Sequence, residues 1–413
     1  MTRRVVVTGL GIVSPVGNNV DQSWEAIKAG RSGIVPITRF DTTDYNVKVA
    51  GEVKNWDPTD YMSAKDARRR DAYQHYLVAA TQEAIRCAHY TLAETECPRA
   101  GTIVGSSVGG VSSYYDTAQM IFETQDPRRI TPFGIPMLMV NGGSDLISIM
   151  TGARGPSYTP TSACATGADC IGHAFDLIRM GKIDSALAGC GEAPIFPIAM
   201  AAFDRTGACS RDVDNPERAS RPFDKNRSGL VFGEGAGVLV LETFERAQAR
   251  GADILAEMVA YGATSDAFHI TAPDPEARGA SEAIACALQD AQLKPEAIHY
   301  INAHGTATAL NDPMETRAVK RVFGDYAYRV PMSSTKSMTG HAMGATAAME
   351  AVFTVLAIRD QIAPPTINYE TQDPECDLDV VPNEARALPI EYAMSNSFGF
   401  GGHNVSLIFK RFE

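Results

Sequence analysis

The sequence has no long hydrophobic run and no recognisable targeting segment. No window approaches the ~18 uninterrupted apolar residues that a transmembrane helix requires. Only a few apolar residues separate residues 1–4 from Thr8 and Gly9, which is too short for the core of a signal peptide. We therefore expect a protein that neither spans a membrane nor carries a secretory signal.

Closely spaced cysteine pairs are also missing. The eight cysteines include no Cys-x-x-Cys motif, the spacing typical of zinc and redox sites. Most of them lie in apolar stretches such as 285–287, where a small buried thiol is expected. An even number of cysteines leaves disulfides open, but without a secretory signal we expect reduced thiols in the cytoplasm.

A surplus of basic residues is lacking as well. The 413 residues include 37 Lys and Arg against 49 Asp and Glu, so the formal net charge is −12. This argues against nucleic-acid binding as the main activity, because attraction to the phosphate backbone requires a basic surface. The chain is 45% hydrophobic and 21% charged, an ordinary globular composition that suggests several domains or one large fused unit.

What is present is a regular alternation of strand-like and helix-like segments. A helical period over 168–180 ends at Gly181, a typical C-cap residue. Short apolar runs bounded by small residues predict buried strands at 101–105, 185–189, 237–241 and 299–302. No Pro/Ser-rich linker interrupts the pattern, so we expect layered α/β structure.

The first strand is predicted at 4–8, and the Gly9-Leu10-Gly11 segment after it predicts a tight turn before a helix through 21–24. Glycine loops after a strand bind dinucleotides, but Ser14 occupies the third glycine position here. A nucleotide site is therefore the less favoured interpretation.

Two sequence segments recur in the same order. The Glu-Ala-Ile-x-Cys-Ala pattern at 83–88 returns at 282–287, and each copy precedes an apolar strand, at Ile103 and at Ile301. A second match pairs 161–164 with 333–336, and each of these leads through glycine into an Ala-rich helix. Matches in the same order predict a duplicated α/β half.

Cys164 is the first candidate for chemistry. It lies at the start of a helical period, where free N–H groups and the positive end of the helix dipole favour a thiolate. Small neighbours at 160–167 leave room for a substrate carbonyl, and the backbone N–H of the cysteine can face an oxyanion. A buried structural thiol is the alternative, and we assign that role to the other seven cysteines.

Two histidines support the interpretation of Cys164 as a nucleophile. His304 precedes Gly305 just past an apolar strand, and His341 follows Gly340 at the head of an Ala-rich helix. Both positions suit a site at strand and helix ends better than a packed core. A zinc site formed by Cys164, His304 and His341 is conceivable, but no paired ligand spacing supports it. The other histidines are interpreted as surface or hydrogen-bonded groups.

Two further segments belong to the candidate site. Lys336 lies among small polar residues shortly before His341, and it is either an exposed charge or a buried ion-pair partner. The turn at 396–402 combines glycines with two aromatic residues. Glycine permits the close backbone approach that a second oxyanion donor needs, while a plain tight turn is the alternative.

These segments, in this order, resemble the β-ketoacyl-acyl-carrier-protein synthases, most closely the type II elongating enzyme. The resemblance covers essentially the whole chain. It rests on Cys164, His304, the Lys-Ser-Met-Thr-Gly-His motif at 336–341 and the Gly-Phe-Gly-Gly motif at 399–402. It implies the thiolase fold, with duplicated α/β halves in a five-layered αβαβα architecture. Residues 1–255 would form the half with the cysteine, and residues 256–413 the half with both histidines.

The resemblance also implies a mechanism. Cys164 accepts an acyl chain from acyl carrier protein, and His304 and His341 donate hydrogen bonds to the malonyl thioester carbonyl during decarboxylation. The resulting enolate attacks the Cys164 thioester and lengthens the chain by two carbons. The backbone N–H groups of Cys164 and Phe400 correspond to the oxyanion hole. No metal or cofactor is implied, because the substrates arrive on the phosphopantetheine of the carrier.

Other positions correspond by the same resemblance. Lys336 and Glu350 match a supporting ion pair, and Phe400 also matches a gating residue of the acyl pocket. Thr306 and Thr308 match residues that contact the pantetheine. Val108 and Phe203 match positions that line the acyl cavity.

Several departures leave the substrate open. Ala165-Thr166 follows the cysteine where Thr-Ser is commoner, His403 replaces a usual threonine, and Val108 is smaller than the usual isoleucine. The segment 192–198 and Arg205 resemble aromatic-polyketide ketosynthases more. A type II polyketide ketosynthase is therefore the alternative. A non-catalytic chain-length partner subunit is disfavoured by the presence of Cys164.

The partner implied is acyl carrier protein, and the enzyme is expected to be a cytoplasmic homodimer. The carrier is acidic, so an enzyme with a net charge of −12 attracts it only through local basic clusters. We predict that two such clusters flank the mouth of the tunnel and steer the carrier. They comprise Lys65, Arg68, Arg69 and Arg70 in one segment and Arg128 and Arg129 in another.

Overall fold

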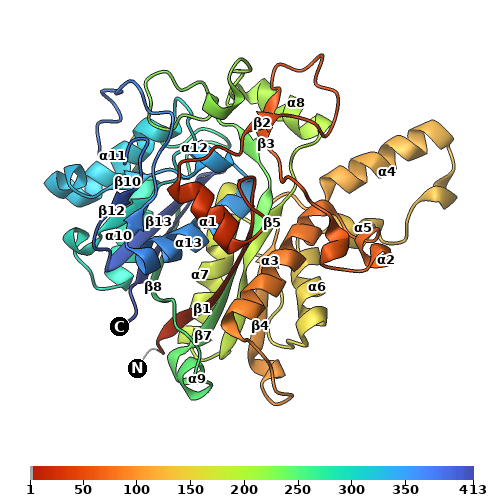
Figure 1. The fold of residues 1–413 in the computed structure, drawn as a ribbon, viewed down its shortest axis with the longest axis horizontal. Helices are drawn as coiled ribbons and strands as arrows, with labels where there is room; N and C mark the ends of the chain where they lie inside the picture. Colours follow the sequence, from red (N-terminus) through yellow and green to blue (C-terminus); the bar gives the residue numbers. More distant parts are fainter. Residues whose placement is uncertain (1–2) are drawn as a thin grey trace.

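The structure is a computed structural model that describes residues 3–413. Its centre is a nine-stranded sheet in the order β10-β9-β13-β14-β8-β1-β7-β5-β4 (Figure 1). The strands are β1 (Val5–Val13), β4 (Ala100–Gly105), β5 (Ser185–Glu192), β7 (Gly235–Thr243), β8 (Ala256–Ser265), β9 (Tyr300–Asn302), β10 (Met332–Ser333), β13 (Tyr392–Gly399) and β14 (His403–Lys410).

The sheet consists of two halves with the same strand order. The first half runs β4-β5-β7-β1 and the second runs β9-β13-β14-β8. In each half the first pair is parallel and the next two pairs are antiparallel. The halves meet where β1 pairs with β8 at 5–7 and 256–258. The predicted duplication is confirmed, because the repeated segments lie in the equivalent helices α3 (Ala72–Ala88) and α10 (Arg278–Asp290).

Helices form one layer outside each half of the sheet and one layer between the halves. α3 packs on β1 and β7, and α10 packs on β8 and β14 (Figure 1). Between the halves, α7 (Thr166–Arg179) and α13 (Met343–Asp360) contact each other and strands of both halves. α13 is buried from Met343 to Ile358, since its Ala-rich sequence is apolar on nearly every side. This is the five-layered αβαβα arrangement that the family resemblance implied.

The first strand differs from the prediction. Instead of ending at a turn, β1 continues through Gly9 and Gly11 to Val13. A Cβ atom at Gly9 would lie 2.2 Å from the Ala84 carbonyl oxygen, and one at Gly11 would lie 1.8 Å from that of Ala80. Both carbonyls belong to α3. The glycines therefore allow α3 to pack directly on the strand, and they form no phosphate-binding loop.

Two cysteines also differ from the prediction. All eight are free thiols, but Cys87 and Cys286 are exposed rather than buried. They occupy equivalent positions on α3 and α10, whose outer faces form the surface of the molecule. Apolar neighbours in the sequence therefore did not place these thiols inside, because the side that a helix buries depends on its period.

Shorter elements complete the fold. None of the helices described in residues 3–413 combines the length and the apolarity that a membrane span needs. Helices α2, α4, α5 and α6 gather on the side of the molecule away from α11 (Figure 1). The remaining elements are α1 (Val20–Lys28), α2 (Ala64–Ala67), α4 (Val111–Thr124), α5 (Gly134–Leu138), α6 (Gly142–Thr151), α8 (Pro197–Thr206), α9 (Phe244–Ala249), α11 (Asn311–Phe323), α12 (Lys336–Thr339), β2 (Val35–Pro36), β3 (Val49–Gly51), β6 (Phe232–Gly233), β11 (Ile362–Ala363) and β12 (Arg386–Ala387).

Candidate active site

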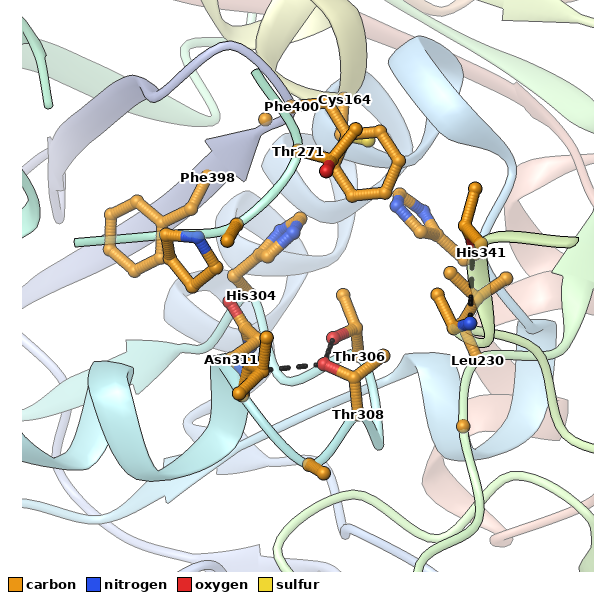
Figure 2. A pocket seen from close by; sticks show the side chains of 18 of the residues that line it. Cys164, Leu230, Thr271, His304, Thr306, Thr308, Asn311, His341, Phe398 and Phe400 are labelled. Carbon is orange, nitrogen blue, oxygen red and sulfur yellow. Dashed lines mark hydrogen bonds between the residues drawn. The ribbon is translucent and has the colours of Figure 1, made fainter. Parts of the chain in front are cut away.

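One cavity of about 280 Å³ brings together side chains from both halves of the chain. Cys164 comes from the turn before α7, His304 from the loop after β9, and His341 from the turn before α13. Figure 2 shows these side chains directed into the same cavity. Other predicted substrate or gating residues line it as well: Phe203, Thr306, Thr308 and Phe400.

The nucleophile lies on a constrained turn. Cys164 belongs to a 3-10 turn, Ala163–Ala165, that leads directly into α7. Ala163 has a φ of +51°, a left-handed conformation that costs an alanine about 1–2 kcal/mol. The hydroxyl of Thr166 accepts a hydrogen bond from the Ser162 N–H at 3.0 Å and donates to the Ala163 carbonyl at 2.8 Å. These contacts hold a backbone geometry that directs the thiol into the cavity.

Burial raises the pKa of the Cys164 thiol to about 11. The backbone N–H groups of Phe400 and of Cys164 itself, together with the charge of Lys336, act in the opposite direction but have a smaller effect. The prediction of a thiolate is therefore wrong for the free site. Removal of water from around the sulfur disfavours the charged form, so the thiol keeps its proton at neutral pH.

The turn that carries Phe400 packs directly on the nucleophile. A Cβ atom at Gly399 would lie 2.7 Å from the Ser162 carbonyl oxygen and 3.1 Å from the Cys164 nitrogen. Only glycine permits this approach. It brings the N–H of Phe400 to the sulfur beside the N–H of Cys164. Two donors that converge on one atom are the arrangement of an oxyanion hole.

The two histidines lie against each other at the cavity. Their ring centroids are 5.5 Å apart and the rings are nearly perpendicular, at 86°. The Nδ1 atom of His341 is 3.1 Å from the hydroxyl of Thr346 on α13. The loop of His304 is fixed by Glu315, whose carboxylate accepts the N–H groups of His304 and Gly305 at 2.8 and 2.7 Å.

Both histidines are uncharged. Burial lowers the pKa of His304 well below its usual value, and the charge of Lys336 and the neighbouring His341 lower it further. Burial, followed by the charge of Lys336, lowers the pKa of His341 in the same way. At neutral pH each ring therefore carries one N–H and one free lone pair, so each can donate a single hydrogen bond to a substrate.

A buried ion pair lies next to the histidines. The ammonium of Lys336 is 2.6 Å from a carboxylate oxygen of Glu350, and both side chains are about 1% exposed. Burial raises the pKa of Glu350 to about 7, although Lys336 opposes this shift. The pair therefore places the Lys336 ammonium close enough to Cys164, His304 and His341 to act on all three, in surroundings of low polarity.

An aromatic stack and a pair of threonines form other parts of the lining. The Phe400 ring stacks on Phe203 of α8, with centroids 5.9 Å apart and an interplanar angle of 18°. The hydroxyls of Thr306 and Thr308 are 2.9 Å apart (Figure 2). Within residues 3–413, Cys164 and the two histidines form no cluster that could hold a metal ion.

The chain matches two adjacent family models over most of its length. The model named beta-ketoacyl synthase, N-terminal domain, matches residues 2–247, and the model of the C-terminal domain matches residues 255–370. The chain belongs to the β-ketoacyl synthase family. It is therefore a condensing acyltransferase, as its motifs indicated.

Individual relatives of this synthase match over its full length. The 3-oxoacyl-(acyl-carrier-protein) synthase 2 of Synechocystis sp. is 49% identical over 411 residues, which cover 100% of this chain and 99% of the relative. The solved ishigamide ketosynthase/chain length factor is 37% identical, with a TM-score of 0.92 and 100% of both chains covered. A type II PKS ketosynthase, solved in complex with its acyl-carrier protein, is 33% identical over 100% of both chains, with a TM-score of 0.91.

The synthase has a further site residue that the sequence analysis missed. Glu315 is fully buried on α11 and holds the backbone of the His304 loop. Burial raises its pKa to about 7. Glu315 shares one buried face of α11 with Met314, Ala318 and Val319. An acidic residue on the apolar face of a helix is the signal that identifies such a position, because an unpaired buried carboxylate is costly.

Several predicted residues of the synthase lie elsewhere. Val108 follows β4 and is not among the residues that line the cavity at Cys164. The two basic clusters do not line it either. The first cluster lies in and just after α2, where the Arg69 guanidinium is 4.5 Å from the centre of the Phe133 ring, whereas Arg128 and Arg129 follow α4. Arg128 forms an exposed ion pair with Asp126.

Proposed function

We propose that this synthase condenses malonyl-acyl-carrier-protein with an acyl chain held on Cys164 and so lengthens fatty acids by two carbons. The observation that carries the proposal is a cavity in which Cys164 faces two uncharged histidines. A covalent nucleophile divides a condensation of two substrates into two displacements. Uncharged imidazole N–H groups stabilise an enolate oxygen without removing a proton.

Acyl transfer is the first displacement. The Cys164 sulfur attacks the thioester carbonyl of the acyl carrier, a C–S bond to Cys164 forms, and the C–S bond to the carrier breaks. The Cys164 thiol has a pKa of about 11, so it loses its proton as the sulfur attacks, and the released pantetheine thiolate takes up a proton. The N–H groups of Cys164 and Phe400 stabilise the tetrahedral oxyanion.

Decarboxylation and condensation follow. Carbon dioxide leaves the malonyl group, and the electron pair of the broken bond forms an enolate whose oxygen accepts hydrogen bonds from His304 and His341. The Thr346 hydroxyl can donate to Nδ1 of His341, which leaves the N–H on Nε2 for the substrate. The enolate carbon then attacks the Cys164 thioester, a C–C bond forms, and Cys164 leaves as a thiolate that recovers its proton from solvent.

The remaining residues support these steps. Burial keeps both histidines neutral, and Lys336, paired with Glu350, reinforces this because its charge disfavours a second positive charge nearby. Phe400 gates the acyl cavity by moving off Phe203. Thr306 and Thr308 contact the pantetheine, and Phe203 lines the acyl cavity. No step changes an oxidation state, so the proposal includes no metal and no cofactor beyond the phosphopantetheine of the carrier.

Sequence identity favours fatty acids over polyketides. This chain is 49% identical to a 3-oxoacyl-(acyl-carrier-protein) synthase 2, but 33% identical to a type II PKS ketosynthase and 37% identical to the ishigamide ketosynthase/chain length factor. The polyketide ketosynthase stays as the second candidate because of the segment 192–198. A non-catalytic chain-length subunit is disfavoured, since Cys164 is present and directed into the cavity.

We further propose that the synthase is a cytoplasmic homodimer. The free thiols of all eight cysteines support a reducing compartment. Exposed apolar side chains on or directly after the neighbouring helices α4, α5 and α6 support an interface with a second copy, because such surfaces mark protein contacts. These side chains are Tyr114, Phe122, Ile135, Met139 and Ile149.

The function is tested with the protein purified alone. Incubation with a fatty-acyl carrier should increase the intact mass by one acyl group, and a digest should place that group on Cys164. Addition of malonyl carrier should then yield a β-ketoacyl carrier two carbons longer. A panel of acyl carriers measured by mass spectrometry identifies the preferred chain. Condensation only with a second, co-expressed subunit, or repeated extension to a polyketone, would instead support the polyketide ketosynthase.

Carrier docking on the two basic clusters gives a second expected result. Charge reversal by Arg68→Glu together with Arg129→Glu should raise the KM for carrier-bound substrate by about tenfold or more, because complementary charge governs the encounter. The KM for a pantetheine thioester should change little. Arg411→Glu, an exposed arginine near the C-terminus, is the matched control. Equal effects on both substrates would contradict docking at these clusters.

A further inference from the structure

Asp169, in the first turn of α7, is a buried carboxylate held by two hydroxyl groups. The Ser162 hydroxyl donates to one of its oxygens, and the Tyr261 hydroxyl donates to the other at 2.5 Å. The Asp169 side chain is only 9% exposed. Both donors are neutral, and no ion pair to Asp169 is present among residues 3–413.

Burial of the Asp169 carboxylate without a cation destabilises the fold, which suggests that the carboxylate is retained for a function. A buried carboxylate without a cation loses most of its hydration and regains only part of it from hydroxyl donors. The start of α7 contributes some compensation, because the N-terminal end of a helix favours negative charge. Burial, reinforced by Asp169, raises the pKa of Tyr261, so its hydroxyl keeps the proton that it donates.

The first donor connects Asp169 to the nucleophile. Ser162 is followed by Ala163, in the left-handed conformation, and then by Cys164. The Ser162 N–H donates to Thr166, and the Ser162 carbonyl oxygen lies against Gly399 in the turn that carries Phe400. The hydrogen bond to Asp169 fixes the side chain as well. Ser162 is thereby held at its N–H, its carbonyl and its hydroxyl, and it anchors the turn that directs Cys164.

The second donor connects Asp169 to the other half of the chain. Tyr261 belongs to β8, the first strand of the second half. Its ring lies directly against Gly172 of α7, where a Cβ atom would be 2.3 Å from the ring. Tyr261 therefore links β8 to α7 twice, through its ring at Gly172 and through its hydroxyl at Asp169.

We infer that Asp169 is a positioning residue for the nucleophile: through Ser162 it holds the Cys164 turn, and through Tyr261 it sets that turn against the second half, which carries both histidines. The inference rests on the proposed function, because it concerns acyl transfer to Cys164. It predicts that the Asp169 network matters for attack by the sulfur and not for decarboxylation, which takes place at His304 and His341.

The test separates the two half-reactions in Asp169→Ala and Tyr261→Phe. Acyl transfer from carrier to Cys164 should fall by about tenfold or more in Asp169→Ala and by about threefold or more in Tyr261→Phe, because small misplacements of reacting atoms are expensive. Malonyl decarboxylation, measured on enzyme alkylated at Cys164, should change by less than about twofold. Asp169→Asn keeps one acceptor oxygen and should recover part of the acyl-transfer rate.

Tyr158→Phe is the matched control. It removes the hydroxyl of a neighbouring tyrosine, 3.4 Å from His173, and leaves both hydrogen bonds to Asp169 intact. This variant should transfer acyl groups at the rate of the unaltered enzyme. Unchanged acyl transfer in Asp169→Ala and Tyr261→Phe, or an equal loss in both half-reactions, overturns the inference. Should Asp169→Ala fail to fold, Tyr261→Phe decides the question.

A substrate-independent readout distinguishes this inference from the proposed function. Alkylation of Cys164 by iodoacetamide needs no carrier protein, and Asp169→Ala should slow it relative to Tyr158→Phe. If the unaltered enzyme accepts no acyl chain, the proposed function fails while this comparison still tests the positioning role. Equal alkylation rates in the two variants would overturn the positioning role alone.

Discussion

We expect Cys164→Ala to abolish the acyl-enzyme and to reduce condensation by at least about 10³-fold, because alanine offers no nucleophile and the two displacements cannot be separated. Cys164 is the cysteine that lines the cavity of the two histidines and has two backbone N–H groups facing its sulfur. Intact-mass analysis after incubation with an acyl carrier should show no added acyl group, and the condensation product should be absent.

Cys209→Ala is the matched control for this substitution. Cys209 is a buried cysteine of the same apolar cluster as Cys164, and burial raises its pKa to about 12, yet it does not line the cavity. The control should still take up an acyl group. Retention of an acyl-enzyme by Cys164→Ala, or its loss in Cys209→Ala, would contradict the assignment.

The protonation state of Cys164 predicts how the rate of its alkylation depends on pH. Only the thiolate reacts with iodoacetamide, and a pKa of about 11 leaves a small thiolate fraction at neutral pH. Alkylation of Cys164 should therefore speed up about tenfold per pH unit between about pH 7 and 9, since the thiolate fraction rises by that factor below the pKa. A rate that levels off below about pH 8 would show that the thiolate already exists in the free site.

We expect His304→Ala and His341→Ala each to slow malonyl decarboxylation by about 10²–10³-fold, the usual cost of removing one donor from a developing oxyanion. Acyl transfer to Cys164 should be affected less, because its oxyanion is bound by backbone N–H groups. Release of carbon dioxide from malonyl carrier measures the first effect, and intact mass measures the second.

The charge state of the histidines sets the expected pH profile. Burial lowers the pKa of both rings well below the usual value, so neither gains a proton between about pH 6 and 8, and decarboxylation should stay level there. His75→Ala, a histidine on α3 whose pKa burial also lowers, is the matched control and should decarboxylate normally. A decarboxylation rate that follows a single ionisation near pH 6.5 would indicate that one histidine acts as a base.

Much of this protein can be predicted from local patterns. Cys164, His304, Lys336 and His341 lie in short motifs whose residue types already indicate covalent acyl chemistry. The repeated segments predict the duplicated halves, because similar amphipathic patterns form equivalent helices in the same order. In the structure, Cys164 and His341 stand before the equivalent central helices α7 and α13, so the duplication itself brings them to one cavity.

Predictions from local patterns are wrong where the environment of a residue is set by a segment far away in the sequence. Gly9 and Gly11 look like a turn in the sequence, yet they belong to a strand because α3 packs on them. Cys87 and Cys286 have apolar neighbours, yet the outer faces of α3 and α10 expose them. Nothing within a few residues of these positions specifies which neighbour approaches the chain.

The residue types at the site are encoded locally, whereas their charges and alignment depend on the assembled layers. The sequence alone specifies a cysteine at the start of a helix, which taken in isolation favours a thiolate. Packing between the two halves removes water from around it, and this desolvation raises the pKa of the thiol, which therefore keeps its proton. The hydrogen bond from Tyr261 to Asp169 spans 92 residues of sequence and forms only when β8 lies against α7. Burial and long-range contacts are properties of the whole fold, and for this reason no local motif contains them.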